Sequence, residues 1–178
     1  MPLPRSIDTS ENRCKGEKSE IVELCNRAFI QDFGELFDLV ANAVAPMHVQ
    51  ARIDGRLISH AMWSERTLHF ADGTTLTAVY VDAVATDPAF QNRGFGSIVI
   101  RRLNAAIQGF ALGCLATNRP SFYTRAGWER WTGSKGVKTE SGVRLTPDET
   151  VMIFRTAHSP KLDTNCQLVI ENRRGDPW

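Results

Sequence analysis

The sequence lacks any apolar run long enough to cross a membrane, and this absence excludes one broad class of protein. A membrane-spanning helix needs about 20 consecutive apolar residues, and no stretch of the 178 residues approaches that length. The first twenty residues are polar and show no apolar core of a secretory signal. We therefore expect a cytoplasmic protein with no membrane partner.

A strong excess of charge of either sign is also missing. Lys and Arg together number 21, and Asp and Glu together number 20, so the formal net charge is +1. General nucleic-acid binding depends on a clearly basic surface. The composition therefore argues against a nucleic-acid partner.

Cysteine and histidine are too scattered to form a metal centre. The four cysteines include no CxxC pair, and the four histidines lie far apart in the sequence. Zinc sites show closely spaced ligand pairs, and disulfide frameworks belong to small secreted domains. We expect reduced thiols and no bound metal.

Strand and helix patterns alternate along the chain and favour one α/β domain. Residues 1–18 are expected to form a polar lead-in, and residues 19–178 a single domain, a length that supports a core. Apolar spacing and turn signals predict helices over residues 19–29, 34–42, 96–110 and 120–127, and strands over residues 47–53, 57–69, 75–85, 111–116, 128–132, 150–156 and 167–171. The Gly-, Ser- and Lys-rich stretch that runs on to about Pro147 is expected to be a loop.

The most informative stretch covers residues 82–96, DAVATDPAFQNRGFG. An apolar strand leads through a Pro-containing turn into a Gly-rich segment, and an amphipathic helix follows. A Gly-rich loop that ends on a helix N-terminus presents backbone N–H groups and the positive end of the helix dipole. Arg93 adds a positive charge. The stretch therefore predicts a phosphate site.

Two common phosphate-binding motifs do not fit this loop. A Walker loop requires a Lys directly after its last Gly, and no Lys follows Gly96. The dinucleotide fingerprint requires a third Gly where Val99 stands, and residues 98–117 contain no Asp or Glu to bind a ribose. The pattern that remains is Gln-x-x-Gly-x-Gly.

This pattern, placed between a strand and a helix, resembles the acetyl-coenzyme A pyrophosphate loop of the GCN5-related N-acetyltransferases. Residues 121–128, SFYTRAGW, resemble that family's late helix and strand, and residues 79–86, VYVDAVAT, resemble the strand that binds the pantetheine arm. The resemblance implies a single mixed central β-sheet flanked by helices, with acetyl-CoA as cosubstrate. It assigns coenzyme binding to Val84, Ala85, Thr86, Gln91, Asn92, Arg93, Gly94, Phe95, Gly96 and Ser97.

Several further segments resemble the aminoglycoside 2′-N-acetyltransferases, over about residues 32–178. These segments are MHVQARIDGRLISHA, the Gly-Trp pair followed by Trp131, TPDETV, LDT and the final GDPW. The resemblance implies acetyl transfer to the 2′-amino group of an aminoglycoside antibiotic, resistance to that antibiotic, a homodimer, and a C-terminal tail that folds into the substrate pocket. It assigns substrate binding to Asp32, Phe33, Asp82, Asp148, Asp176 and Trp178.

The chain also departs from that subfamily. Asp82 stands where the subfamily commonly has Glu, and the tail carries Arg173 and Arg174. Fewer carboxylates and an extra Arg suit a substrate with fewer ammonium groups and a carboxylate of its own. Kasugamycin fits this description, and we hypothesise that the chain resembles the kasugamycin-modifying branch. The identity of the aminoglycoside and of the acetylated nitrogen stays open.

Amide formation from an amine and a thioester needs a proton acceptor and a proton donor. Asp82 is the first candidate base, acting through water, and the α-carboxylate of Trp178 is the second, by resemblance. Tyr123 is the candidate acid, since a phenol with a pKa of about 10 stays protonated at pH 7. A backbone N–H of residues 84–85 is expected to polarise the thioester carbonyl.

Each of these roles has a structural alternative. Asp82 could be the exposed residue of an alternating strand, Tyr123 a core aromatic and Trp178 a hydrophobic plug. Two other functions also stay open. The same fold could acetylate a polyamine, an amino acid or a protein N-terminus, or it could serve as a non-catalytic acyl-CoA-binding module.

Overall fold

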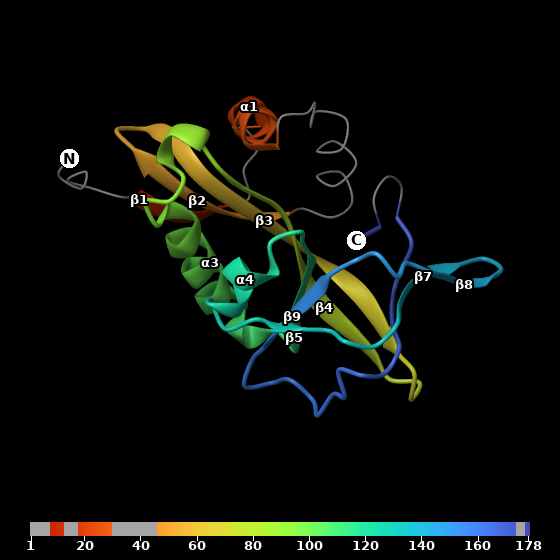
Figure 1. Ribbon diagram of the computed structural model, residues 1–178. Helices are drawn as coiled ribbons and strands as arrows, with labels where there is room; N and C mark the ends of the chain where they lie inside the picture. The colour runs from red at the N-terminus through yellow and green to blue at the C-terminus, as the bar shows by residue number, and fades with distance from the viewer. Residues whose placement is uncertain (1–7, 13–17, 30–45, 174–176) are drawn as a thin grey trace. The chain divides into compact units, whose positions relative to one another are not determined.

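The computed structural model describes residues 8–12, 18–29, 46–173 and 177–178 (Figure 1). The chain forms two compact units: unit 1 comprises residues 1–64 and 81–105, and unit 2 comprises residues 65–80 and 106–178. Strands β3 (Arg56–Phe70) and β4 (Thr75–Thr86) contribute residues to both units. The helix predicted over residues 34–42 lies outside the described residues.

Unit 1 contains an antiparallel arrangement in which β1 (Asp8–Asn12) pairs with β2 (Met47–Ile53), and β2 pairs with β3. Asp54 and Gly55 join β2 to β3 with φ angles of 49° and 81°. Positive φ at both central residues is the conformation that favours Asp-Gly in a two-residue hairpin, so this turn is confirmed. Strand β1 lies within the lead-in, where its sequence DTSEN shows no apolar alternation that would predict a strand.

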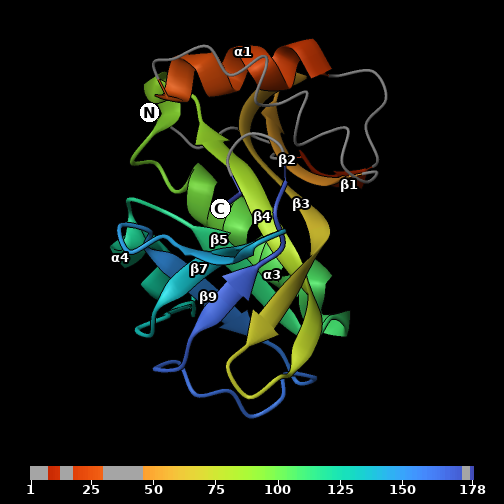
Figure 2. The same cartoon turned by 90° about the vertical axis from the view of Figure 1, so that its right-hand side faces the viewer.

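Helix α1 (Lys18–Phe29) packs on the strands of unit 1 through Ile21, Leu24 and Cys25, which are at most 1% exposed. Its partners in this apolar cluster include Leu57, Met62 and Ala85. Figure 2 shows α1 across the ends of β3 and β4. Burial raises the pKa of the Cys25 thiol to about 12, so this thiol stays neutral.

Helix α3 (Phe95–Ala106) follows β4 through the 3₁₀ turn η1 (Pro88–Phe90) and a short loop. Its buried side includes Phe95, Val99 and Leu103, as the apolar spacing of this segment predicts. The helix ends earlier than predicted, at the 3₁₀ turn η2 (Ile107–Gly109). None of the described helices is long and apolar enough to span a bilayer.

Unit 2 contains a mixed sheet with the strand order β6-β9-β5-β4-β3-β10-β7-β8. Strand β5 pairs with β4 and β10 with β7 in parallel, and the other described pairs of this unit are antiparallel. The strand bounds in this unit are β5 (Leu112–Ala116), β6 (Glu129–Arg130), β7 (Lys135–Thr139), β8 (Gly142–Leu145), β9 (Val151–Arg155) and β10 (Leu168–Ile170). The short helix α4 (Pro120–Thr124) begins at the predicted proline and is followed by Gly127 at φ 88°.

Two tryptophans of unit 2, Trp128 and Trp131, are 2% and 1% exposed, and Trp131 belongs to the apolar core of this unit. The indole N–H of Trp131 donates to the carbonyl oxygen of Cys166 at 2.8 Å. This bond satisfies a polar atom that burial would otherwise leave without a partner.

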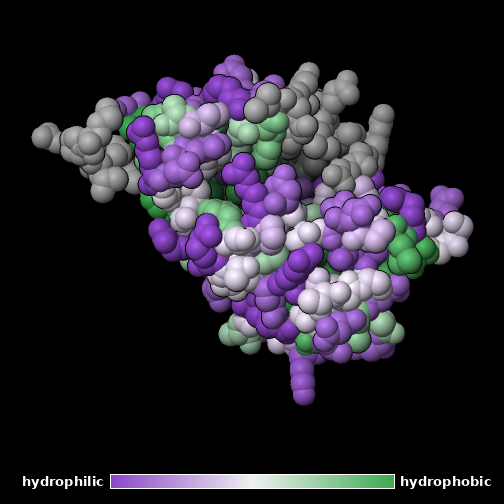
Figure 3. All heavy atoms as spheres, in the orientation of Figure 1, coloured by the Kyte–Doolittle hydropathy of each residue, from purple (hydrophilic) through white to green (hydrophobic). Residues whose placement is uncertain are grey.

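The prediction of a loop that runs on to Pro147 is wrong, because this stretch contains the hairpin of β7 and β8. Strand β8 is exposed along its whole length. Its sequence GVRL therefore does not show the alternation of buried and exposed residues by which a half-buried strand is predicted. Val143 and Leu145 are 47% and 57% exposed. Figure 3 shows green hydrophobic atoms where Figure 1 labels β8.

Candidate functional site

Residues 87–97, which we call the phosphate loop, connect β4 to α3 in unit 1. After η1, Asn92 and Gly94 adopt left-handed φ angles of 60° and 89°, and α3 then begins at Phe95. A Cβ on Gly94 would meet no atom within 4 Å. The backbone conformation, rather than a lack of space, therefore favours glycine at this position.

The N-terminus of α3 is suited to an anion. The first N–H groups of a helix have no partner within the helix and lie at the positive end of its dipole. The first turn of α3 carries no acidic residue. Asn92, Arg93 and Gly94 are exposed, whereas the side chain of Phe95 is buried. Phe95 can therefore serve a bound phosphate only through its backbone.

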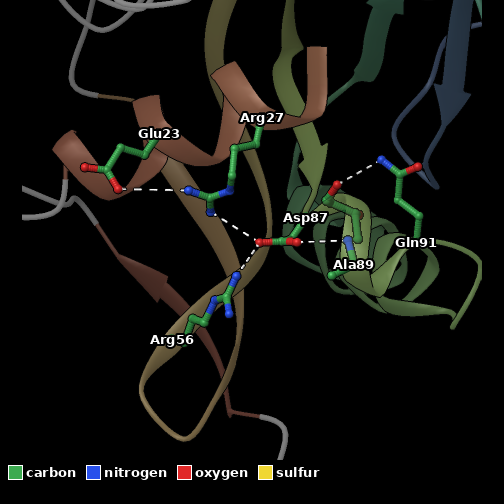
Figure 4. A network of polar contacts seen from close by, with 7 residues as sticks. Glu23, Arg27, Arg56, Asp87, Ala89 and Gln91 are labelled. Carbon is green, nitrogen blue, oxygen red and sulfur yellow. Dashed lines mark hydrogen bonds and ion pairs between the residues drawn. The ribbon is translucent and has the colours of Figure 1, made fainter. Parts of the chain in front are cut away.

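Asp87 holds the phosphate loop to the rest of unit 1 (Figure 4). The residue is 3% exposed. Its Oδ2 accepts from Arg56 Nη2 at 2.8 Å and from Arg27 Nη2 at 3.3 Å, and its Oδ1 accepts from the backbone N–H of Ala89 at 3.0 Å. One carboxylate thus connects α1, β3 and η1, which come from three separate segments of the chain.

The environment of Asp87 favours its ionised form. Burial would raise the pKa of the carboxyl, but the N–H of Ala89 and the guanidinium groups of Arg56 and Arg27 lower it, and the pKa lies below its ordinary value. The side chains of Arg56 and Arg27 are 59% and 45% exposed. Solvent therefore screens these two pairs, and the main consequence of the contacts is a fixed loop geometry.

The side chains of the phosphate loop divide into those that shape it and those at its surface. The amide of Gln91 donates to the carbonyl oxygen of Thr86 at 3.1 Å, so it closes the loop on itself. The guanidinium of Arg93 lies 5.5 Å from the centre of the Phe90 ring, and that of Arg56 lies 5.7 Å from the same ring. Two exposed cations, Arg93 of the loop and Arg56 of β3, therefore add positive potential here.

The end of β4 presents the peptide group of Val84 at the edge of the strand away from β3. The N–H of Asp87 donates to Ile58 of β3 at 2.9 Å, and the carbonyl of Ala85 accepts from the Ser59 hydroxyl at 3.0 Å. Peptide groups of successive residues in an extended strand point to opposite edges. Val84 and Thr86 therefore face the other edge. Asp82 lies half-buried on the same strand.

Tyr123 belongs to unit 2, where it lies on α4 and is 6% exposed. Its ring packs edge-on against Phe122 and Trp128, at centroid distances of 5.0 and 5.9 Å. Burial raises the pKa of the phenol above its ordinary value, and the nearby charge of Arg119 opposes this only in part. The phenol is therefore protonated at neutral pH.

Trp178 is part of the apolar core of unit 2 and is 5% exposed. Its indole N–H donates to the Thr146 hydroxyl at 2.8 Å. Arg66 anchors the segment before it by donating to the carbonyl oxygens of Pro177 and Glu171, at 2.6 and 2.5 Å. The Trp178 side chain is therefore packed into this core, and its predicted roles in catalysis and substrate binding stay predictions.

Of the remaining predicted substrate residues, the structure describes only Asp148. Asp148 is exposed, in a turn of unit 2. Asp32, Phe33 and Asp176 lie outside the described residues. The described residues contain no group of three or more His, Cys, Asp or Glu side chains that could hold a metal ion.

The sequence did not predict the residues whose side chains hold the phosphate loop in place. Asp87 followed by Pro88 carries a signal that could have been used, since Asp before Pro is typical of the start of a helical turn. Arg27 and Arg56 carry no such signal, because ion pairs across 60 and 31 residues depend on the folded chain. His60 and Ser59 were likewise missed.

A comparison with protein-family models matches residues 14–131 to the acetyltransferase (GNAT) domain. The match covers well over half of the chain, and the chain belongs to this family. The predicted fold class, a mixed β-sheet with flanking helices, is confirmed, as is the resemblance to the GCN5-related N-acetyltransferases.

Solved structures share this fold. A GNAT family N-acetyltransferase (YhbS) from Escherichia coli in complex with CoA has a TM-score of 0.69 at 17% identity, over 96% of this chain and 91% of that one. An acetyltransferase from Brucella melitensis in complex with acetyl-CoA has a TM-score of 0.58 at 21% identity, over 70% and 83%.

Other similar structures are much longer than this chain. Eis1 from Mycobacterium abscessus has a TM-score of 0.60 at 21% identity, over 72% of this chain. The present chain covers about a third of Eis1, and about a third of similar structures from Enterococcus faecalis and Kribbella flavida.

We predict that the unfolding free energy of the Asp87→Asn variant changes less than that of wild type as the pH falls from about 6 to about 3. Because the folded-state pKa is lowered, the carboxylate stabilises the fold fully above its ordinary value of 3.8, and this contribution is lost as the pH falls below that value. The loss of unfolding free energy caused by Asp87→Asn should therefore be larger at about pH 6 than at about pH 3. Urea unfolding at both pH values measures this, with Asp148→Asn as the exposed control. An equal loss at both pH values would contradict the role of the buried carboxylate.

Proposed function

We propose that the protein is an acetyl-CoA-dependent N-acetyltransferase that acetylates the 2′-amino group of an aminoglycoside, with kasugamycin as the favoured substrate, and thereby confers resistance. The observation that carries the coenzyme assignment is the phosphate loop, with its left-handed Asn92 and Gly94, its acid-free helix start and its fixation by Asp87. Membership of the acetyltransferase family supports it. Two structures of the same fold hold CoA or acetyl-CoA.

The loop fits a pyrophosphate chemically. Backbone N–H groups at the start of α3 supply hydrogen bonds and the positive end of a dipole, and Arg93 supplies an exposed cation. Toward the other end of the coenzyme, we assign the thioester to the end of β4. There the N–H of Val84 faces the edge of the strand away from β3 and can polarise a carbonyl oxygen.

The reaction joins the amine nitrogen to the acetyl carbonyl carbon as the carbon–sulfur bond breaks. The amine loses one proton and the departing thiolate gains one, so the products are an N-acetyl amine and coenzyme A. An amino sugar is mostly ammonium at pH 7, so a carboxylate that attracts the cation and accepts its proton through water favours the reaction. We assign this role to Asp82.

We assign Tyr123 as the acid. Its buried phenol holds its proton through neutral pH and above, because burial disfavours the phenolate. A thiol has a pKa near 8.5 and a phenol one near 10 in water. The protonated phenol can donate a hydrogen bond to the departing sulfur, and the proton that the amine releases balances the one that the thiolate gains.

The acceptor is assigned from the chain's charge pattern. One amine and one carboxylate on kasugamycin match a chain with a single half-buried candidate carboxylate on β4 and with Arg173 near the tail. The guanidinium of Arg173 lies 5.3 Å from the centre of the Tyr80 ring, and that of Arg66 lies 5.2 Å from the same ring. A cation in this part of the sequence suits a substrate that carries a carboxylate.

We predict that the purified protein releases coenzyme A thiol faster with kasugamycin than with kanamycin or gentamicin. The release is followed with a thiol reagent at equal concentrations of each acceptor, and mass spectrometry identifies the acetylated product. Faster transfer to kanamycin or gentamicin would contradict the kasugamycin assignment. Acetyl-CoA binding without thiol release on any aminoglycoside, polyamine, amino acid or peptide would instead indicate a non-catalytic acyl-CoA-binding module.

We predict that Tyr123→Phe lowers kcat by on the order of 100-fold and leaves the affinity for acetyl-CoA nearly unchanged, because it removes only the proton donor. Tyr80→Phe is the matched control, since it deletes the same atom from the other tyrosine of the chain. Equal kcat values for wild type and Tyr123→Phe would remove the phenol from catalysis and leave Tyr123 as a core aromatic.

A further inference from the structure

A left-handed residue inside β4 requires neighbours that hold it there. Ala83 has a φ of 51°, a conformation that residues with a Cβ rarely adopt because of steric strain. Such strain persists only where the surrounding structure fixes the backbone, and it is concentrated at functional sites. Ala83 directly precedes Val84, whose peptide group we assign to the thioester.

The carbonyl of Ala83 is held by a histidine of β3. His60 Nδ1 lies 3.0 Å from the Ala83 carbonyl oxygen. A carbonyl oxygen only accepts, so Nδ1 carries the hydrogen and donates. In the neutral ring the other nitrogen, Nε2, is then an acceptor.

A second histidine, His48, contacts the other ring nitrogen of His60. His48 Nδ1 lies 2.9 Å from His60 Nε2, and the two rings have centroids 5.2 Å apart. His48 therefore donates to His60 and fixes which nitrogen of His60 faces Ala83. His60 is 0% and His48 3% exposed, and the hydrogen bond between them is buried. Shielding from water makes this bond electrostatically stronger.

The residue beside His60 holds the next carbonyl that faces β3. The Ser59 hydroxyl donates to the Ala85 carbonyl oxygen at 3.0 Å and lies 2.8 Å from Thr86 Oγ1. Two consecutive side chains of β3 thus hold the carbonyls on either side of Val84. With both flanking peptide groups held, the direction of the Val84 N–H is set by β3.

We propose that His60 is a positioning residue for acetyl transfer. It fixes the left-handed turn at Ala83 and thereby aims the Val84 N–H at the thioester carbonyl oxygen, while His48 fixes its tautomer. The inference rests on the proposed function, because it assumes that the acetyl group of acetyl-CoA lies at this end of β4.

The test is an infrared difference spectrum of acetyl-CoA with a ¹³C-labelled carbonyl, bound to the protein in the absence of an acceptor. A hydrogen bond to the carbonyl oxygen lowers its stretching frequency, so the bound frequency should lie below that of free acetyl-CoA. Two variants separate the nitrogens of His60. The amide N–H of Asn replaces Nδ1, and that of Gln replaces Nε2.

We expect His60→Asn to keep the lowered frequency and His60→Gln to lose it. Because small misplacements of reacting groups cost up to about 100-fold in rate, His60→Gln should also lower kcat by on the order of 10- to 100-fold. The KM for acetyl-CoA should change much less. His69→Gln, at a partly exposed histidine of the same strand, is the control and should match wild type in both measurements.

Each outcome bears on the proposal. A lowered frequency and a normal kcat in His60→Gln would overturn it, as would equal losses in the Asn and Gln variants when both fold. If wild type binds no acetyl-CoA, the proposed function fails and the positioning role fails with it. Acetyl-CoA binding by wild type without a frequency shift would overturn the positioning role alone.

Discussion

The site depends on one buried carboxylate, that of Asp87. A charge removed from water must be paired and hydrogen-bonded, or the fold loses stability. Asp87 meets this condition with partners from α1, β3 and η1. The same contacts that satisfy its charge therefore join the end of β4 to the start of the phosphate loop. The left-handed Asn92 and Gly94 that follow then turn the chain into α3.

The two edges of strand β4 have different roles. On the β3 side, Ser59 and His60 hold the carbonyls of Ala85 and Ala83, and Asp87 completes the contact through Ile58. On the other side, the peptide group of Val84 is presented outward. The strained φ of Ala83 is consistent with this division, because strain at one residue allows the next to be aimed. The phosphate loop and the thioester position thus share one support, β3.

The sequence predicted the parts of this arrangement that are local. The Gly-rich loop between a strand and a helix, the Asp54-Gly55 hairpin and the buried faces of α1 and α3 all follow from residues close together in the chain. The supports could not be predicted, because Arg27, Arg56 and His60 meet their partners only after folding. Strands β1 and β8 were missed because neither shows apolar alternation. The side chain of Trp178 is buried in an apolar core, which agrees with the structural alternative that the sequence analysis named for it.

The central claim is that residues 91–97 bind the pyrophosphate of coenzyme A in unit 1. The most direct measurement compares ¹H–¹⁵N NMR spectra of the protein titrated with coenzyme A and with pantetheine, which lacks the pyrophosphate. We expect the amides of Phe95, Gly96 and Ser97 to shift strongly with coenzyme A and little with pantetheine, while the amide of Val84 responds to both. Unchanged amides at residues 95–97 in saturating coenzyme A would contradict the account.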